Sequence, residues 1–342
     1  MFKKQGKTFN RKNDTVENGL KQRIDDLKRL VDQRMLQILD KPAPVSLYEP
    51  MRYSVSSGGK RIRPILLLLS AEAVGSRIEN ALDAAVALEL VHNFTLVHDD
   101  IMDNDDWRRG RQTVHKKWDE STAILAGDGL LVKAYVALAQ VNYPRLQEIV
   151  QHFSQSILQV CEGQALDKEF ESRETVSMDE YFEMIDKKTA RLFSAACEIG
   201  GMIGGGNQEQ VNALATYGRA LGRAFQVQDD LLDVTADQQV LGKDVGSDLE
   251  ENKKTFLIVH FTQTANDDLL QQLQAIRDKK KLSKNDLDKI LEIFQASGTI
   301  RAARTEVDKT LSVAEDALKK LPDSMARVHL QQVLMMLRDR NS

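Results

Sequence analysis

The chain has 342 residues, a length at which an all-helical enzyme can still form one domain. Its formal net charge of −4, from 47 Lys and Arg against 51 Asp and Glu, leaves no general basic excess to attract nucleic acid or anionic lipid. The cysteines are Cys161 and Cys197, and no apolar leader pattern opens the sequence. We therefore expect a cytoplasmic protein with reduced thiols that binds no nucleic acid.

The N-terminal region predicts a tail followed by an amphipathic helix. Residues 1–14 carry many Lys and Arg side chains with almost nothing to bury, which is typical of a disordered tail. From Val16 to about Asp40 the apolar residues follow three-and-four spacing, as on one face of a helix. Pro42 should prevent this helix from continuing.

A basic segment, Gly58–Pro64, precedes the next expected helix. It joins two glycines, which allow close approach of the backbone, to three cations and a proline that can start a helix. Glycines before a helix N-terminus are typical of an anion site. Taken alone, a basic turn facing solvent is the simpler interpretation, and only the acidic motifs that follow favour the anion site.

The segment Ala81–Val97 is apolar on nearly all sides, which is typical of a helix inside a bundle. It leads into Asp99-Asp100-Ile101-Met102-Asp103, a D-D-x-x-D pattern that we call the first acidic box. His92 lies in the apolar part, where a hydrogen-bonded core histidine is the simpler interpretation of this residue alone. Beyond the box, Arg108 and Arg109 either neutralise its carboxylates or bind a phosphate.

The rest of the chain also predicts helices. No proline occurs between Arg145 and Leu321, and strong helix formers dominate. The longest apolar run, at and just beyond Ile65–Leu69, is far shorter than the roughly 20 residues that cross a bilayer, so no membrane span is expected. We expect residues 15–342 to form a single all-α domain.

A second apolar helix is expected over Leu214–Leu232, and it contains the second acidic box, Asp229-Asp230-Leu231-Leu232-Asp233. Residues i and i+4 share a helix face, so the first and last aspartate of each box can bracket one cation. Carboxylates about 4 Å apart repel by roughly 4 kcal/mol at an effective dielectric of about 20, which disfavours a merely solvated acidic face. Oxygen ligands favour Mg²⁺ with a phosphate substrate, and the scattered histidines disfavour zinc.

After the second box, the polar stretch Thr235–Thr255 predicts a long loop, and the charges of Lys243 and Lys253 suggest a lid. A single lysine is more often a solvated surface residue. The C-terminal third, including Ile300–Leu321 and Met325–Leu337, predicts amphipathic helices that pack and dimerise.

From about Ser57 to Thr255 the sequence resembles the trans-prenyl diphosphate synthase family. The shared motifs, in that family's order, are the Gly-Gly-Lys-Arg segment, His92 seven residues before the first box, Arg108-Arg109-Gly110, Lys188-Thr189, Phe225-Gln226 with the second box, and Lys243. The resemblance implies an all-α bundle of about ten or more helices around a central cavity, and a homodimer. It also implies Mg²⁺-dependent head-to-tail (1′-4) condensation of isopentenyl diphosphate with an allylic prenyl diphosphate. Ala190 and Asn252 depart from frequent family glycines, without loss of charge.

The resemblance further implies a role for each matching residue. The isopentenyl diphosphate would be held by Gly59, Lys60, Arg63, His92 and Arg109, and the allylic diphosphate by Arg108, Lys188, Lys243 and Lys253. Thr189, Phe225 and Gln226 would line the site of the allylic cation. Asp99, Asp103 and Asp229 would be the main ligands of three Mg²⁺ ions, with Asp100, Asp230 and Asp233 as further ligands or neighbouring acceptors. The residues expected to act in catalysis are Asp99, Asp100, Asp103, Lys188, Thr189, Gln226 and Asp229.

Product length is linked to Phe94 and its neighbour Thr95. Phe94 stands five positions before Asp99, a helical rise of about 7.5 Å. By itself Phe94 is equally well one more core aromatic. The short first box with an aromatic at this position resembles archaeal-type geranylgeranyl diphosphate synthases, which implies a C20 product. Farnesyl and longer chains remain the competing products.

Two other functions fit parts of this pattern. A class I terpene cyclase would carry an Asn/Asp-Ser/Thr-Glu motif in place of the second box. A non-catalytic subunit of a heteromeric synthase would be expected to have lost box residues. Because both boxes are intact, the sequence favours the synthase.

Overall fold

The computed structural model describes residues 11–235, 247–277, 279 and 282–339. Their regular secondary structure is helical apart from one hairpin of two two-residue strands, in which Trp107 pairs with Gln112 and Arg108 with Arg111. The elements are α1 (Arg11–Ile38), α2 (Val45–Val55), α3 (Ile62–Ala73), the 3₁₀ helix η1 (Ile78–Ala81), α4 (Leu82–Met102), β1 (Trp107–Arg108), β2 (Arg111–Gln112), α5 (Val114–Lys117), α6 (Glu120–Leu138), α7 (Leu146–Ser172), α8 (Met178–Ile185), the π-helix η2 (Asp186–Ala190), α9 (Arg191–Ile203), α10 (Gln208–Thr235), α12 (Ser247–Glu250), α13 (Phe256–Thr264), α14 (Asp267–Arg277), α15 (Lys284–Ala296), α16 (Thr299–Leu318) and α17 (Met325–Arg338).

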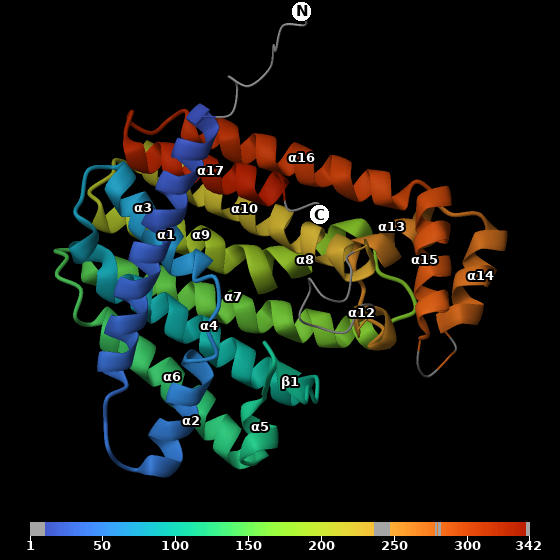
Figure 1. Ribbon diagram of the computed structural model, residues 1–342, viewed down its shortest axis with the longest axis horizontal. Helices are drawn as coiled ribbons and strands as arrows, with labels where there is room; N and C mark the ends of the chain where they lie inside the picture. The colour runs from blue at the N-terminus through green and yellow to red at the C-terminus, as the bar shows by residue number, and fades with distance from the viewer. Residues whose placement is uncertain (1–10, 236–246, 278, 280–281, 340–342) are drawn as a thin grey trace, which may run out of the picture.

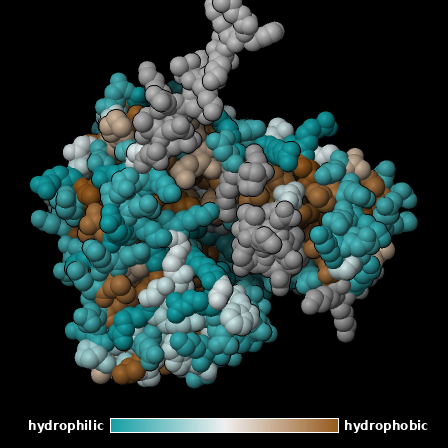
Figure 2. Space-filling view, viewed as in Figure 1, coloured by the Kyte–Doolittle hydropathy of each residue, from teal (hydrophilic) through white to brown (hydrophobic). Residues whose placement is uncertain are grey.

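The long helices α4, α7, α10 and α16 lie roughly along the longest axis of the molecule, while α14 and α15 stand at one end (Figure 1). The surface on this face is largely hydrophilic and carries hydrophobic residues in separate patches (Figure 2). The all-α bundle expected from the sequence is confirmed.

The two apolar segments are confirmed as central helices. Along α4 the run Ala84–Val91 is buried without interruption, and α10 buries Tyr217, Leu221 and Val227 among others. Each helix ends at its acidic box, since Asp103 follows the last residue of α4 and α10 stops at Thr235, two residues after Asp233. Both groups of carboxylates therefore lie at the negative end of a helix dipole, where a cation is stabilising.

Two expected loop segments differ from the structure. Helix α1 begins at Arg11, inside the segment 1–14 that we expected as a tail, and residues 1–10 lie outside the described part of the chain. In the expected loop Thr235–Thr255, residues Ser247–Glu250 form the short helix α12. Lys243 lies outside the described residues. Local periodicity did not predict either helical turn, because both are too polar to show an apolar stripe.

Helix α6 gives a finding that the sequence pattern did not predict. Among the described residues it is the one helix long and apolar enough to cross a membrane by length and composition, with a mean hydropathy of 1.4. One such helix is weak evidence, because core helices of soluble proteins meet the same criterion. Only 39% of the apolar window is buried, so much of the apolar surface of α6 faces outward. The run Ile65–Leu69 lies in α3 and is fully buried.

Candidate active site

The three aspartates of the first box have different surroundings. Asp99 is half-buried, and burial raises its pKa while the charge of Lys188 opposes the rise. Asp103 accepts hydrogen bonds from Lys168 at 3.0 Å and from Lys253 at 3.1 Å. Burial would raise the pKa of Asp103, but Lys253 and Lys168 hold it below the ordinary value. Asp99 and Asp103 therefore face a common, strongly charged site.

Asp100 faces away from this cluster. It is buried and accepts a hydrogen bond from Arg108 Nε, and burial raises its pKa to about 6. The position between Asp99 and Asp103 on the helix turns its carboxylate toward the hairpin that carries Arg108. This contact fits the role of a neighbouring acceptor, which the resemblance left open for Asp100 beside that of a metal ligand. It also engages part of the Arg108 guanidinium that we expected to bind phosphate.

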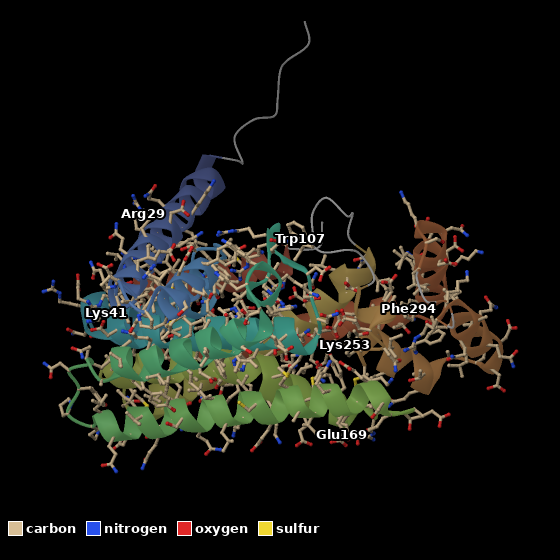
Figure 3. All side chains as sticks on the ribbon, turned by 90° about the horizontal axis from the view of Figure 1, so that it is seen from below. Arg29, Lys41, Trp107, Glu169, Lys253 and Phe294 are labelled. Atoms are coloured by element: carbon tan, nitrogen blue, oxygen red, sulfur yellow. The ribbon has the colours of Figure 1, made fainter. Side chains whose placement is uncertain are left out.

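A cluster of lysines and carboxylates extends the site onto α7. Lys188 Nζ lies 2.5 Å from Asp167 Oδ2, and Lys253 Nζ lies 3.4 Å from the same oxygen. Lys253 also contacts Glu171 at 3.0 Å. Lys253 is buried, and in Figure 3 it lies in the view between Trp107 and Glu169. The ammonium groups thus lie where the carboxylates meet, and an incoming polyphosphate with its metal ions would compete with these same pairs.

The second box has one aspartate bound entirely by the protein. Asp230 accepts hydrogen bonds from Tyr181 Oη at 2.7 Å, from Gln226 Nε2 at 2.9 Å and from the backbone N–H of Phe256 at 2.7 Å. All three partners donate, which fits an ionised carboxylate, although burial raises the pKa of Asp230 to about 7. Because both of its oxygens are engaged, Asp230 fits a positioning role better than the metal-ligand role expected from the sequence. Asp233 is buried one turn further along α10.

Asp230 also fixes the orientation of Gln226. The amide nitrogen of Gln226 is bound to Asp230, so its oxygen Oε1 faces Thr189, whose hydroxyl donates to it at 2.7 Å. The structure therefore brings together Thr189 and Gln226, as the sequence predicted. Since the Thr189 proton is used in this bond, the lone pairs of the hydroxyl oxygen stay available to a cation.

The Gly58–Pro64 segment forms a tight turn before α3. Gly58 and Gly59 have φ angles of 81° and 131°, and a Cβ on Gly59 would lie 2.7 Å from the Arg109 guanidinium. Arg109 Nη1 donates to the Gly58 carbonyl. The backbone conformation thus favours glycine at residue 59, and a larger residue there would also displace the Arg109 guanidinium. Lys60 is exposed and follows directly on the two glycines that Arg109 contacts.

Arg63 and His92 form the inner part of this basic group. Arg63 Nη1 lies 3.2 Å from His92 Nε2, and Arg63 Nε is buried without a hydrogen-bond partner among the described residues. Because arginine only donates, His92 Nε2 must accept, which leaves the proton on Nδ1. Burial and the nearby arginines hold the pKa of His92 well below its ordinary value, so it is neutral. Burial lowers the pKa of Arg63 to about 10, while Glu89 and Asp229 oppose the fall; this links Arg63 to the second box.

Arg61, the third cation of the segment, faces the protein interior. It is 4% exposed and donates to Glu89 Oε1 and Asp32 Oδ1, each at 2.8 Å, and to the carbonyls of Gly58 and Val55. Its backbone is left-handed, with φ 51°, at the residue that precedes α3. Arg61 therefore anchors the turn, and only Lys60 and Arg63 remain to face a phosphate.

The aromatic residues lie deeper in the bundle. Phe225 packs at 5.5 Å, centroid to centroid, on Phe193, and the Arg63 guanidinium lies 4.6 Å from the centre of the Phe193 ring. Phe94 is buried and packs edge-on against His98 at 4.7 Å. Thr95 is half-buried, and its hydroxyl donates to the His92 carbonyl at 2.9 Å.

Four polar residues of α7 were not predicted from the sequence. Asp167, Lys168 and Glu171 contribute to the lysine cluster, and both polar atoms of the Gln164 side-chain amide are buried without a partner among the described residues. Their spacing of three and four residues places them on one face of α7. This spacing was the available signal, but an amphipathic surface helix gives the same pattern.

The site fits a metal that is bound together with substrate. In the described ranges no three acidic, histidine or cysteine side chains form a group that could hold a metal by themselves. The available ligand atoms are carboxylate oxygens, and the buried Gln164 amide, which has no partner among the described residues, shares a face of α7 with Asp167. Mg²⁺ characteristically binds one or two carboxylates and completes its ligand shell with water and substrate phosphates, so these residues fit it.

Comparison with known proteins agrees with this site. The polyprenyl synthetase family model matches residues 44–294. The bundle and the site define an all-helical trans-prenyltransferase. The chain belongs to the polyprenyl synthetase family, which confirms the resemblance noted from the sequence.

Individual relatives extend the match over most of the chain. A geranylgeranyl diphosphate synthase of Methanosarcina mazei is 49% identical over 242 residues, which are 69% of this chain and 75% of that protein. The crystal structure of geranylgeranyl pyrophosphate synthetase from Pyrococcus horikoshii has a TM-score of 0.90 and 40% identity, covering 95% of this chain and 99% of that one. A polyprenyl synthase from Caulobacter crescentus, solved with calcium and isoprenyl diphosphate, has a TM-score of 0.84 and 26% identity over 96% and 98% of the two chains.

Proposed function

We propose that this protein condenses isopentenyl diphosphate with an allylic prenyl diphosphate, head to tail (1′-4), and releases geranylgeranyl diphosphate. The observation that carries the proposal is the pair of acidic boxes at the ends of α4 and α10, with Lys253 bound to Asp103 of the first box and Lys188 bound to Asp167 of α7. The family relatives named as geranylgeranyl diphosphate synthases support the C20 product. A farnesyl or longer-chain synthase is the alternative.

Polyprenyl synthases are metal-dependent, and we propose that this chain uses three Mg²⁺ ions. Asp99, Asp103 and Asp229 are the proposed ligands, with Asp233 close by. Asp100 and Asp230 instead hold Arg108 and Gln226 in place. When bound, Mg²⁺ would withdraw charge from the allylic diphosphate and so favour cleavage of its carbon–oxygen bond.

The side chains around the allylic substrate share two tasks. Lys188 and Lys253 exchange their contacts with Asp167 and Asp103 for the diphosphate, which stabilises it as a leaving group. Thr189 and Gln226 present oxygen lone pairs toward the allylic carbon, where positive charge develops. The Thr189–Gln226–Asp230 chain keeps these dipoles fixed before the reaction begins.

The isopentenyl diphosphate is held on the side of the site opposite the allylic diphosphate. Arg63, Lys60 and Arg109 supply charge, and neutral His92 supplies a hydrogen bond from Nδ1. His92 is a binding residue, because its lowered pKa and its contact with Arg63 make it a poor proton acceptor. By analogy with the family, the departing diphosphate accepts the proton that is lost when the new double bond forms.

The proposal is tested by incubating purified protein with labelled isopentenyl diphosphate and, separately, C5, C10 and C15 allylic diphosphates. We expect a C20 alcohol after dephosphorylation of the products, and no elongation when a chelator removes Mg²⁺. A single product of another length would support the proposed reaction and contradict the C20 product. Diphosphate release without isopentenyl diphosphate would instead indicate a terpene cyclase, and elongation only with a second protein would indicate a subunit.

Replacement of Phe94 by Ala is expected to lengthen the products beyond C20. Phe94 is buried one and a half turns before Asp99, where its ring can stop the growing hydrocarbon, and Ala removes that volume. Product chromatography measures the change. Phe153→Ala is the control: this ring is also buried but lies on α7 against Tyr135, so its loss should leave the product length unchanged. Equal product distributions for wild type and Phe94→Ala would contradict the assignment.

We propose that the protein is a homodimer that associates through α6. Leu125, Val132 and Val136 are 60%, 63% and 46% exposed and share one face of α6, and Leu158 of neighbouring α7 is 53% exposed. A contiguous apolar face of this kind is typical of a protein interface. The proposed contact is therefore on α6, whereas the sequence suggested the C-terminal third.

Val132→Glu is therefore expected to halve the molar mass measured by size-exclusion chromatography with light scattering, because it puts a charge into the apolar contact. Met325→Glu on α17, where the native side chain is 68% exposed, is the control and should leave the mass unchanged. The reverse result would move the interface to the C-terminal helices.

We further infer a single domain over residues 15–342, since one hydrophobic cluster extends from Leu27 of α1 to Leu337 of α17. We also propose a cytoplasmic location, which the two free cysteines, Cys161 and Cys197, support, because thiols stay reduced in the cytosol.

A further inference from the structure

The helix that carries Lys188 and Thr189 is interrupted by a π-helical bulge. α8, η2 and α9 are continuous, and within η2 the backbone N–H of Arg191 donates to the Asp186 carbonyl, five residues earlier. Such bulges are rare, are less favourable than α-helix and are found mainly at functional sites. Some specific contact must therefore stabilise η2.

Two glycines allow neighbouring helices to approach the bulge closely. A Cβ on Gly163 of α7 would lie 2.2 Å from the backbone nitrogen of Lys188, and one on Gly222 of α10 would lie 2.6 Å from Cα of Ala190. The backbone of η2 is thus held between α7 and α10 with no free space on either side. Packing fixes the distance between the helices, and polar contacts add to it in fixing their relative register.

Asp186 supplies such a contact at the start of the bulge. Its carboxylate accepts two hydrogen bonds from Arg223, at 3.0 and 2.5 Å, and one from Arg219 at 2.5 Å. Arg219 and Arg223 belong to α10 and are four residues apart. The same face of α10 continues through Gln226, which accepts from Thr189, so one stripe of α10 contacts η2 at two points.

We infer that Asp186, Arg219 and Arg223 form a positioning clamp that sets the register of η2 against α10. The clamp acts outside the reaction cavity, and its effect is to direct Thr189 toward Gln226 and Lys188 toward Asp167. Asp186 and the two arginines are thus positioning residues for the allylic side of the site. The expected effect of the clamp on kcat rests on the proposed function, whereas its expected effect on the structure of η2 does not.

The outer side of the clamp borders an open cavity of about 610 Å³, which Arg191 and Lys187 also line. Each cation there already forms an ion pair with an acidic side chain. The pairs are Lys187 with Glu162 and Glu183, Arg191 with Glu198, and both clamp arginines with Asp186. The arrangement therefore favours a structural clamp over a second anion site.

Asp186→Asn tests the clamp with little change in shape, and Asp83→Asn is its matched control. Asp83 forms a partly exposed ion pair with Arg34 at 2.7 Å, far along the chain from η2. In hydrogen exchange, we expect the amides of residues 187–190 to exchange at least tenfold faster in Asp186→Asn, with no change in Asp83→Asn. In steady-state assays, we expect kcat to fall by roughly 10- to 100-fold, as for a reacting geometry displaced by about 1 Å, while KM for isopentenyl diphosphate stays constant. Asp186→Glu should restore most of the loss.

The two measurements separate this inference from the proposed function. Lost protection in Asp186→Asn supports the clamp even if the wild type elongates no substrate, which would refute only the proposed reaction. Unchanged protection, or a lowered melting temperature with unchanged kcat and exchange, would overturn the clamp. If Asp186→Asn does not fold, Arg219→Gln replaces it. Arg219 is 63% exposed in its side chain and Arg223 keeps its two bonds, so a smaller rise in exchange is expected, and no rise would overturn the inference.

Discussion

Replacement of Asp99 by Asn is expected to lower kcat/KM for both substrates by about 10³-fold. Asn keeps the size of the side chain but removes the charge, and a carboxylate that binds Mg²⁺ contributes several kcal/mol to stabilising the transition state. A loss of about 4 kcal/mol corresponds to about a thousandfold in rate. Because Asp99 is half-buried beside Asp103 and Lys188, the fold should tolerate the change. Steady-state kinetics over a range of Mg²⁺ concentrations measure the effect, and the variant should need more Mg²⁺ for its residual activity.

Asp106→Asn is the control for this variant. Asp106 lies three residues past the box, pairs with Lys116 at 2.9 Å and is 64% exposed in its side chain. Its replacement removes the same charge from the same region, and we expect less than a twofold change in kcat/KM. If Asp99→Asn and Asp106→Asn had similar activities, the first box would not be the metal site.

Replacement of Arg61 by Ala is expected to lower the free energy of unfolding by roughly 3–5 kcal/mol, because it leaves the Glu89 carboxylate buried without its cationic partner, with only Asn93 Nδ2 donating to it at 3.3 Å. Arg61 and Glu89 are 4% and 2% exposed, and their ion pair is 2.8 Å long. The left-handed backbone at residue 61 would also lose the four hydrogen bonds that hold it. Chemical denaturation followed by circular dichroism provides the measurement.

Arg34→Ala provides the comparison, since the Arg34–Asp83 pair has a similar length but is partly exposed and should contribute less than about 1 kcal/mol. The double variant Arg61→Met with Glu89→Gln should be more stable than Arg61→Met alone, because the second change removes the unpaired buried charge. A loss below about 1 kcal/mol for Arg61→Ala would show that Glu89 finds another partner.

The parts of the site that the sequence predicted share a clear local signal. Each acidic box ends a helix that is apolar on nearly all sides, and no purely structural role explains three carboxylates there. The order of the basic and acidic motifs then supplied the family, which the comparisons confirm. Segments that are apolar on nearly all sides also located the central helices, because the wide apolar surface of α4 and α10 is encoded in consecutive residues.

Other features depend on contacts between distant segments. Nothing local distinguishes Arg61, which is buried, from Lys60 and Arg63, which face the site; the difference comes from Glu89, 28 positions later. Asp167 looked like one more charge on an amphipathic helix. The opposite orientations of Asp99 and Asp100 follow from helix geometry, but only the position of Arg108 decides what Asp100 does. The π bulge has no signature in apolar spacing, since its glycine neighbours lie on α7 and α10.

Helix α4 carries both the proposed metal ligand Asp99 and the proposed pocket floor Phe94. A helix is stiff along its axis, so the rise between Phe94 and Asp99 stays at about 7.5 Å. One change of side-chain volume at residue 94 therefore changes the expected product length while the reacting groups stay in place. Enzymes that make lipids of different length can therefore diverge by single substitutions at the floor, without passing through inactive ancestors.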